Sequence, residues 1–260
     1  MGERLPGVRL ALTTLTVLPV RGPELLDRRA AGTAMRLAPA VGLLLGGLGA
    51  ALLAVLDALT DGPPLLACAG AIGVLALLTR GLHLDGLADL ADGLGTHGPP
   101  ERARDVMKQP DVGAFGVVAL VLVPLVQVSA LLACATAGRG PAALVLAAGT
   151  GRLAVTAACT AATPAATSTG LGALVAGTVR RGEPTVLAVV VVAGGTLWAL
   201  LDGQPVLLPG LAVVVALVTA TLLRRHAVRR LGGITGDVLG ALVEVATTAT
   251  LVVLALSWAG

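Results

Sequence analysis

Apolar residues recur along the chain in long runs that short polar connections separate. Each run approaches the ~20 residues that an α-helix needs to cross the hydrocarbon core of a bilayer. The qualifying runs are residues 37–60, 65–82, 112–137, 141–163, 184–201, 205–223 and 237–259. This pattern predicts an all-α fold, namely a polytopic membrane helix bundle with about seven transmembrane helices.

A shorter apolar stretch, residues 5–20, precedes these runs. Because it is short for a membrane span, we interpret it as an N-terminal interfacial helix that lies on the membrane surface. No convincing internal repeat and no polar linker divides the chain. We therefore expect residues 1–260 to form a single integral-membrane domain.

The composition is that of a membrane protein, and the placement of the basic residues accounts for the net positive charge. Hydrophobic residues make up 56% of the 260 positions and charged residues only 13%, which is far from the composition of a soluble domain. The net charge of +3 could suggest a nucleic-acid partner, but the basic residues follow a membrane pattern. We therefore expect the lipid bilayer, and no nucleic acid, as a partner.

Basic residues gather in alternate connections. They precede the first run, separate the second from the third, and follow the fourth and the sixth, whereas connections 61–64, 138–140 and 202–204 hold only Arg139. By the positive-inside rule, the basic connections and the N-terminus are cytoplasmic, and the C-terminus is outside.

The connection after the second run carries three aspartates, Asp85, Asp89 and Asp92. Their spacing of i, i+4 and i+7 places them on one face of a helix. Three carboxylates repel one another unless a cation neutralises them, and Mg²⁺ prefers such oxygen ligands together with phosphates. We predict a magnesium site here, the alternative being a solvated acidic face. His83 is either a structural hydrogen-bonding residue or a catalytic one.

Two basic residues are candidates for binding an anionic substrate. Lys108 follows the aspartates closely, where a cation could bind a diphosphate, although an ordinary solvated helix is the alternative. Arg152 lies about eleven residues from either end of the fourth run, which is roughly 16 Å deep at 1.5 Å per residue. A charge at that depth is costly, so we expect Arg152 to be functional or paired.

A third motif follows the sixth run and opens the seventh. Its candidate substrate-binding residues are Arg229, Gly232, Gly233, Thr235, Gly236, Asp237 and Glu244. The glycine-rich turn offers backbone N–H groups and a hydroxyl just before a helix N-terminus, which suits phosphate oxygens. The structural alternative is that Asp237 merely starts a helix and that Glu244 pairs with Arg152.

Three separated motifs of the chain resemble, in the same order, those of the cobalamin synthases, or adenosylcobinamide-GDP ribazoletransferases. Residues 83–93 are similar to the family's His-Leu-Asp-Gly-Leu-Ala-Asp signature, 113–116 to its next block, and 232–237 to its Gly-Gly-x-Thr-Gly-Asp motif. The chain departs from the family at Gln109, where an acid is usual, and at Asp111, where a base is frequent.

The resemblance implies a reaction in which adenosylcobinamide-GDP and α-ribazole, or its 5′-phosphate, give adenosylcobalamin, or its 5′-phosphate, and GMP, with Mg²⁺. It implies that Asp85, Asp89 and Asp92 bind metal, that Lys108, Arg152 and Arg229 bind phosphate oxygens, and that the turn 232–236 contacts substrate. His83 and Asp92 are the leading candidates for the catalytic base, with Glu244 third. The implied location is the bacterial inner membrane, with a cytoplasmic active site.

Two other classes of function share some of these features. A CDP-alcohol phosphotransferase also gathers aspartates at a membrane edge, but its signature has longer gaps than the interval from Asp85 to Asp89. A cation transporter could use Arg152 and Glu244 inside the membrane, but its acids should then lie near the midplane in several spans. A homo-oligomer is compatible with all three readings.

Overall fold

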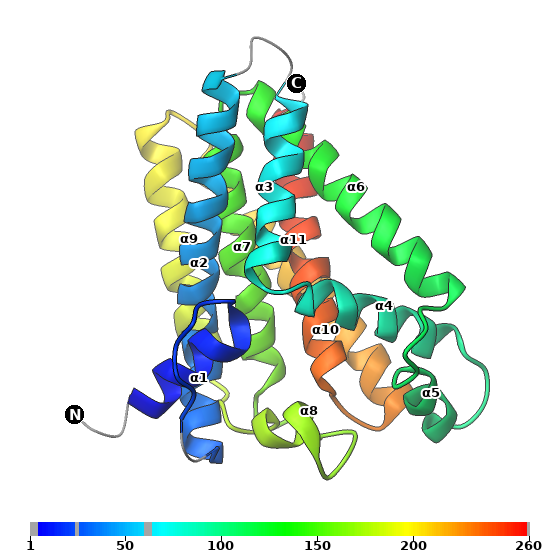
Figure 1. Cartoon of the computed structure of the whole chain (residues 1–260). Coiled ribbons are helices and arrows are strands. Elements are labelled where there is room, and N and C mark those ends of the chain that lie inside the picture. The colour runs from blue at the N-terminus through cyan, green and yellow to red at the C-terminus, as the bar shows by residue number, and fades with distance from the viewer. Residues whose placement is uncertain (1–4, 24–25, 60–63, 259–260) are drawn as a thin grey trace.

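The computed structural model describes residues 5–23, 26–59 and 64–258. Within these ranges the chain is helical, and its β-pairing consists of two isolated bridges. The helices are α1 (Leu5–Leu15), α2 (Arg28–Leu59), α3 (Leu65–Leu78), α4 (Leu82–Gly95), α5 (Pro100–Val106), α6 (Ala114–Thr136), α7 (Gly140–Ala158), α8 (Gly170–Val175), α9 (Glu183–Leu201), α10 (Leu208–Leu231) and α11 (Gly236–Trp258). Figure 1 shows a bundle of long helices with the short helices α1, α4, α5 and α8 gathered near one end.

Six helices are long and apolar enough to cross a membrane: α2, α6, α7, α9, α10 and α11. The predicted span 65–82 is broken, because α3 ends at Leu78 and α4 leaves it at an angle of 87°. Arg80 and Gly81 both have positive φ angles, 55° and 69°, and two left-handed residues in succession cannot continue a right-handed helix. The described residues thus contain six spans, or seven if α3 and α4 count as one. α4 packs against α11 and α6 near one end of the bundle (Figure 1).

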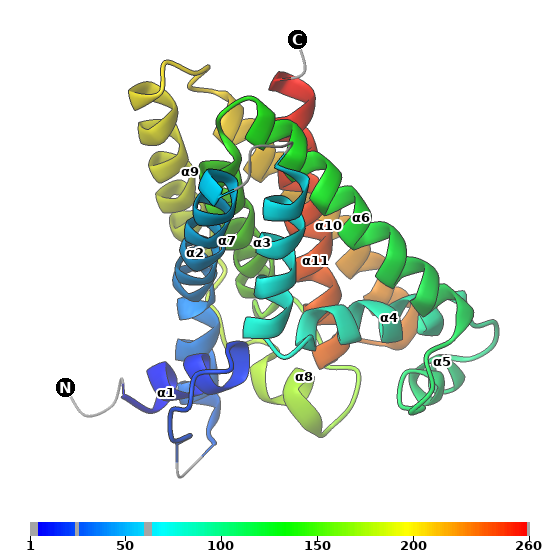
Figure 2. The ribbon, with the colours of Figure 1, turned by 45° about the horizontal axis from the view of Figure 1, so that its top comes forward.

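α1 behaves as the sequence predicted for a helix that does not span. It has 11 residues, about half the length that a crossing helix needs, and it packs across the end of α2 (Figure 2). Leu10, Ala11 and Leu15 are buried in this contact region. Gly7 allows the approach, because a Cβ atom there would collide with the side chain of Thr33.

The centre of the bundle is α7, which packs against α2, α6, α9, α10 and α11. In its most apolar stretch 78% of the residues are buried, against 17% for α9, whose remaining surface is apolar and suits lipid. Glycines permit the close contacts around α7. A Cβ atom at Gly42 of α2 would collide with the carbonyl of Ala148, and one at Gly151 would lie 2.9 Å from the carbonyl oxygen of Val243.

The connections sort to the two ends of the bundle as the basic residues predicted. The α6–α7 and α9–α10 connections lie at one end, where Arg139 and Asp202 form an ion pair with Nε and Oδ2 3.4 Å apart. The connections that hold α4, α5 and α8, and the α10–α11 turn, lie at the other end (Figure 1). Helix α10 continues to Leu231, beyond the predicted limit of 223, so the basic residues that follow the predicted span lie on the helix itself.

Candidate active site

A cavity of about 460 Å³ opens at the end of the bundle where the basic connections meet. Its walls come from α1, α2, α4, α5, α7, the start of α11 and the segment 159–182, which holds α8 and is called the α8 segment below. The polar and glycine residues that line it are Thr14, His83, Arg104, Lys108, Thr167, Thr169, Gly170, Gly172, Thr235, Gly236, Asp237 and Gly240. Its volume is typical of a pocket for a small-molecule ligand.

Five of the residues predicted from the sequence line this cavity, namely His83, Lys108, Thr235, Gly236 and Asp237. The sequence analysis missed Arg104 and the threonines of the α8 segment as site residues. Arg104 precedes Lys108 by four residues, a spacing that places two cations on one side of a helical turn and could have revealed it. The threonines of the α8 segment have no such signal, because only the fold brings them to the cavity.

The seam between α4 and α11 places His83 beside Asp237. A Cβ atom at Gly86 would lie 2.8 Å from the Cα atom of Asp237, and one at Gly240 would lie 3.2 Å from the backbone of His83. Two glycines therefore let the helices touch backbone to backbone. This contact brings the first signature and the last motif, which are about 150 residues apart in sequence, to one wall.

The structure does not bring Asp92 to the cavity. Its side chain is buried, and its Oδ2 and Oδ1 accept hydrogen bonds from the backbone N–H groups of Gly113 (2.8 Å) and Gly116 (2.9 Å) at the start of α6. A carboxylate in this position satisfies free N–H groups and the positive end of the helix dipole. Both glycines are needed, because a Cβ atom at either would collide with the carboxylate.

In the described residues, the side chains of Asp85 and Asp89 do not accept hydrogen bonds from a helix N-terminus as Asp92 does. Asp85 is exposed and Asp89 is half-buried. Burial, and then the negative charges of Asp237, Asp85 and Asp92, raise the pKa of Asp89 to about 6. Neither carboxylate lines the cavity itself, and Asp85 lines a separate surface cavity together with Val112 and Leu120. Their negative charges nevertheless act on each other and on Asp237 at the start of α11.

The predicted magnesium ligands do not form a ready-made cage. In the described ranges no three His, Cys, Asp or Glu residues lie in a metal-binding arrangement, and Asp92 is committed to α6. The donor set still fits Mg²⁺, which usually takes one or two protein carboxylates and completes its shell with water and substrate phosphates. Asp85 and Asp89 are the residues that could hold it.

The turn 232–236 divides into a structural part and a part that reaches the cavity. Gly232 ends α10 with φ +86°, and Gly233 packs against the backbone of Ala165. Ile234 donates its N–H to Pro164 (2.9 Å) and accepts from Ala166 (3.1 Å), which ties the turn to the α8 segment. Thr235 directly precedes α11, and its Oγ1 accepts a hydrogen bond from the N–H of Val238 (3.2 Å) in the first turn of that helix.

The predicted phosphate ligand Arg229 is exposed and does not line the cavity. The cations that do are Arg104 and Lys108. Arg104 is held firmly, because its Nη1 donates to the carbonyl of Leu231 (2.6 Å) and its Nη2 to Oε1 of Glu101 (2.9 Å). Lys108 is largely exposed and its Nζ lies 3.9 Å from Oδ1 of Asp105, so it is free to move toward an anion.

Arg152 and Glu244 face the protein interior and share a separate small cavity of about 30 Å³. Because α7 ends at Ala158 rather than at 163, Arg152 lies six residues from that end, or about 9 Å rather than 16 Å. Its Nη2 is 3.4 Å from Nδ1 of His83. Glu244 accepts a hydrogen bond from Nε2 of Gln127 (2.8 Å). Neither residue lines the large cavity.

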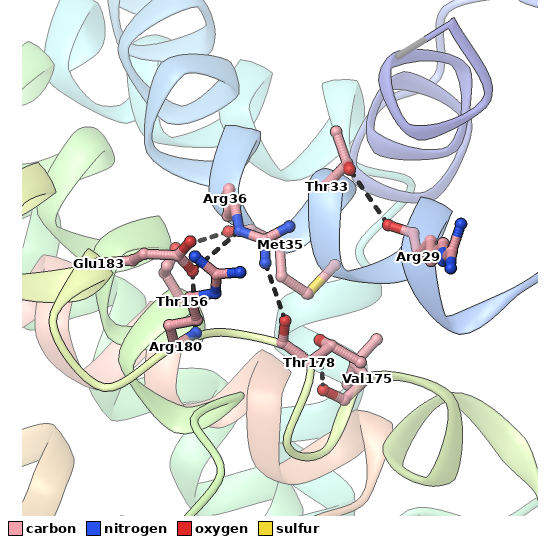
Figure 3. A network of polar contacts seen from close by, with 9 residues as sticks. All are labelled: Arg29, Thr33, Met35, Arg36, Thr156, Val175, Thr178, Arg180 and Glu183. Atoms are coloured by element: carbon pink, nitrogen blue, oxygen red, sulfur yellow. Dashed lines mark hydrogen bonds and ion pairs between the residues drawn. The ribbon is translucent and has the colours of Figure 1, made fainter. Parts of the chain in front are cut away.

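The α8 segment that forms one wall is anchored to α2 by arginines (Figure 3). Nε of Arg36 lies 2.8 Å from Oε2 of Glu183, and its Nη2 donates to the carbonyl of Thr178 (3.1 Å). Oε2 of Glu183 also accepts the N–H of Arg180 (2.9 Å). Arg28 donates to the carbonyls of Ala173 and Ala176. These contacts fix a segment that otherwise has only one short helix.

Comparison with known proteins identifies the family. Residues 7–255 match the family model described as cobalamin-5-phosphate synthase, so the match covers nearly the whole chain. The chain belongs to the cobalamin-5-phosphate synthase family. The match includes every residue of the cavity, from Thr14 to Gly240.

Curated relatives of the family are similar along their whole length. A protein of Frankia casuarinae is 48% identical, and the alignment covers 96% of this chain and 94% of that protein. Relatives from Nocardioides sp. and Stutzerimonas stutzeri are each 43% identical and are also covered almost completely. All three are named adenosylcobinamide-GDP ribazoletransferase. No solved structure matches the chain.

Proposed function

We propose that this protein is an adenosylcobinamide-GDP ribazoletransferase, which joins the adenosylcobinamide phosphate moiety to α-ribazole or its 5′-phosphate and releases GMP. The observation that carries the proposal is the cavity at the α4–α11 seam. It combines two cations, Arg104 and Lys108, with His83 from the first motif and Asp237 from the last, in a chain nearly half identical to a relative with this name. A CDP-alcohol phosphotransferase or a transporter does not account for that similarity.

The cavity residues supply what such a transfer needs. A ribazole hydroxyl attacks the phosphorus that is linked to the corrinoid, a new P–O bond forms, and the bond to the GMP oxygen breaks, so that GMP leaves with the bonding electrons. Arg104 and Lys108 would bind the diphosphate oxygens and neutralise their charge. Positioning of both substrates in one cavity would supply much of the rate enhancement.

The hydroxyl proton needs an acceptor in the cavity. Among the acidic side chains of the described residues, Asp237 lines it, whereas Asp92 and Glu244 do not. Oδ2 of Asp237 accepts a hydrogen bond from Oγ1 of Thr235 (3.1 Å), which orients the carboxylate at the start of α11. Asp237 is therefore our proposed general base, in place of the candidates drawn from the sequence.

Magnesium is part of the proposal. When bound, it would withdraw charge from the diphosphate and so ease the departure of GMP. Asp85 and Asp89 would hold it, because Asp92 already accepts two hydrogen bonds at the start of α6. The cytoplasmic side of the inner membrane is the proposed location of the cavity, and the basic residues of its connections support that orientation.

The test uses the full chain purified in detergent. Incubation with adenosylcobinamide-GDP, α-ribazole and MgCl₂ should release GMP in proportion to enzyme, and EDTA should abolish the release. Asp237→Asn should lower turnover by at least about 100-fold, whereas Asp57→Asn at the far end of α2 should leave it unchanged. Absence of GMP with both α-ribazole and its 5′-phosphate would refute the proposed function.

A further inference from the structure

Arg152 is a buried cation with an unusual set of neighbours. It is only 3% exposed, and its Nε has no hydrogen-bond partner in the described residues. Its Nη2 approaches Nδ1 of His83 at 3.4 Å within hydrogen-bonding geometry. Since the large cavity is lined by His83 and not by Arg152, the guanidinium lies behind the histidine as seen from the cavity.

The acidic side chain nearest to Arg152 in its small cavity is that of Glu244. Glu244 and Arg152 line the same small cavity together with Gln127, Thr79 and Thr247, and no direct ion pair within 4.0 Å joins them in the described part of the chain. Gln127 donates to Glu244 and also to Oγ1 of Thr248 (3.1 Å), which fixes the carboxylate. This arrangement keeps the guanidinium charged inside the bundle.

The contact with Arg152 determines where the proton of His83 lies. A guanidinium has five N–H donors and no acceptor, so Nδ1 of His83 must offer its lone pair. A neutral imidazole that accepts at Nδ1 carries its proton on Nε2. Nε2 has no hydrogen-bond partner among the described residues, and it is the nitrogen left for a ligand in the cavity.

We propose that Arg152 is a positioning residue that holds His83 as a hydrogen-bond donor, with Nε2–H directed to a phosphate oxygen of the substrate. This inference rests on the proposed function for the identity of the ligand, but the protonation pattern of His83 does not. In this role His83 cannot act as the general base through Nε2, because that nitrogen already carries a proton. Arg152 correspondingly does not bind phosphate itself, unlike the expectation from the sequence.

Three substitutions test whether His83 acts as a hydrogen-bond donor or as a general base. The amide nitrogen of glutamine can reach the position of Nε2 and donate, but it cannot take up a proton. His83→Gln should therefore stay within about 10-fold of the wild-type rate of GMP release. His83→Ala should lose about 100- to 1,000-fold, the usual effect of removing one donor to a developing charge. His83→Asn, which is too short to reach, should resemble His83→Ala. His97→Gln, at an exposed position, is the control.

The second measurement requires no substrate. The chain has three histidines, so ¹⁵N-histidine NMR of the detergent-solubilised protein gives few signals, and His83→Gln assigns that of His83. We expect an unprotonated Nδ1 and a protonated Nε2 in the wild type. Arg152→Lys, which keeps a donor, should preserve this pattern, and Arg152→Met should shift it toward the other tautomer.

Two results would overturn the inference. One is a proton on Nδ1 of His83 in the wild-type spectrum, and the other is a His83→Gln variant that is folded but as inactive as His83→Ala. Failure of the proposed function would look different, because the wild type would then release no GMP while the spectrum would be unaffected.

Discussion

Gly86 of α4 lies directly against the backbone of Asp237 in the first turn of α11, so that a Cβ atom at Gly86 would be 2.8 Å from both the Cα atom and the carbonyl oxygen of Asp237. The atoms in the way belong to a backbone and cannot rotate aside. The distance between α4 and α11, and with it the relation between His83 and Asp237, depends on the absence of a side chain at this position.

Gly86→Ala should therefore separate the two helices and damage the site. We expect a loss of stability of about 1–3 kcal/mol, as for overpacked interiors, together with a fall in turnover of more than 10-fold. Thermal unfolding in detergent and GMP release measure the two effects. Gly73→Ala on α3, where a Cβ atom meets nothing within 4 Å, is the matched control and should leave both unchanged.

The hydrophobic pattern predicted most of the fold, because lipid-facing helices need apolar residues over a fixed length. It predicted six long helices, the short α1 outside the spans and the grouping of connections at two ends, but its seventh span, 65–82, is broken between α3 and α4. It did not predict the break at Arg80 and Gly81, since the run 65–82 is apolar up to Leu78 and holds only one charged residue, Arg80, near its end. The positive φ angles of Arg80 and Gly81 prevent α3 from continuing. It also placed the end of α7 at 163 rather than at Ala158, because residues 159–163 are apolar enough to continue a predicted span.

The motifs predicted the site in part. Helical spacing correctly put the aspartates on α4, but spacing within one helix says nothing about which neighbour each carboxylate meets. Asp92 meets the N-terminus of α6, and this contact depends on Gly113 and Gly116 in a segment more than twenty residues away. Arg152 is buried, but the partner expected from the sequence was Glu244 or a substrate phosphate, whereas its hydrogen-bond neighbour is His83 of another helix.

The position of Asp92 leads to a prediction about stability rather than metal binding. Asp92→Asn replaces an acceptor with an N–H₂ group that faces a backbone N–H of α6. We expect a loss of about 1–3 kcal/mol, the cost of leaving a buried polar group unpaired, with reduced turnover but an unchanged Mg²⁺ concentration for half-maximal activity. Asp111→Asn is a control in the same connection, since Asp111 is exposed. A strong rise in the Mg²⁺ requirement of Asp92→Asn would instead make Asp92 a ligand.

Asp85 and Asp89 should show the opposite behaviour. Each has a carboxylate that the bundle does not need for folding, so Asp85→Asn and Asp89→Asn should unfold at nearly the wild-type temperature. Because each variant removes a proposed ligand, the Mg²⁺ concentration for half-maximal GMP release should rise by at least about 10-fold. Titration of MgCl₂ at saturating substrate measures this shift. Normal Mg²⁺ curves for both variants would favour the solvated acidic face.

The anchor between α2 and the α8 segment provides the last prediction. Arg36 ties the segment to α2 through Glu183 and the carbonyl of Thr178, whereas the guanidinium of Arg29 on the same helix points away from this network (Figure 3). The Arg36–Glu183 pair is about one-third exposed, so it contributes at most about 1 kcal/mol to stability. Its main effect is to hold the wall that carries Thr167 and Thr169.

Arg36→Ala should therefore change substrate binding more than folding. We expect the KM for at least one of the two substrates to rise several-fold, with kcat reduced less than the ratio kcat/KM, because a loosened wall weakens binding before it disturbs the reacting groups. The unfolding temperature should fall by only a few degrees. Arg29→Ala, which removes an arginine from the same helix without breaking the anchor, should match the wild type in both measurements. Equal kinetic effects of the two variants would show that overall positive charge, rather than the anchor of the α8 segment, controls substrate binding at this wall.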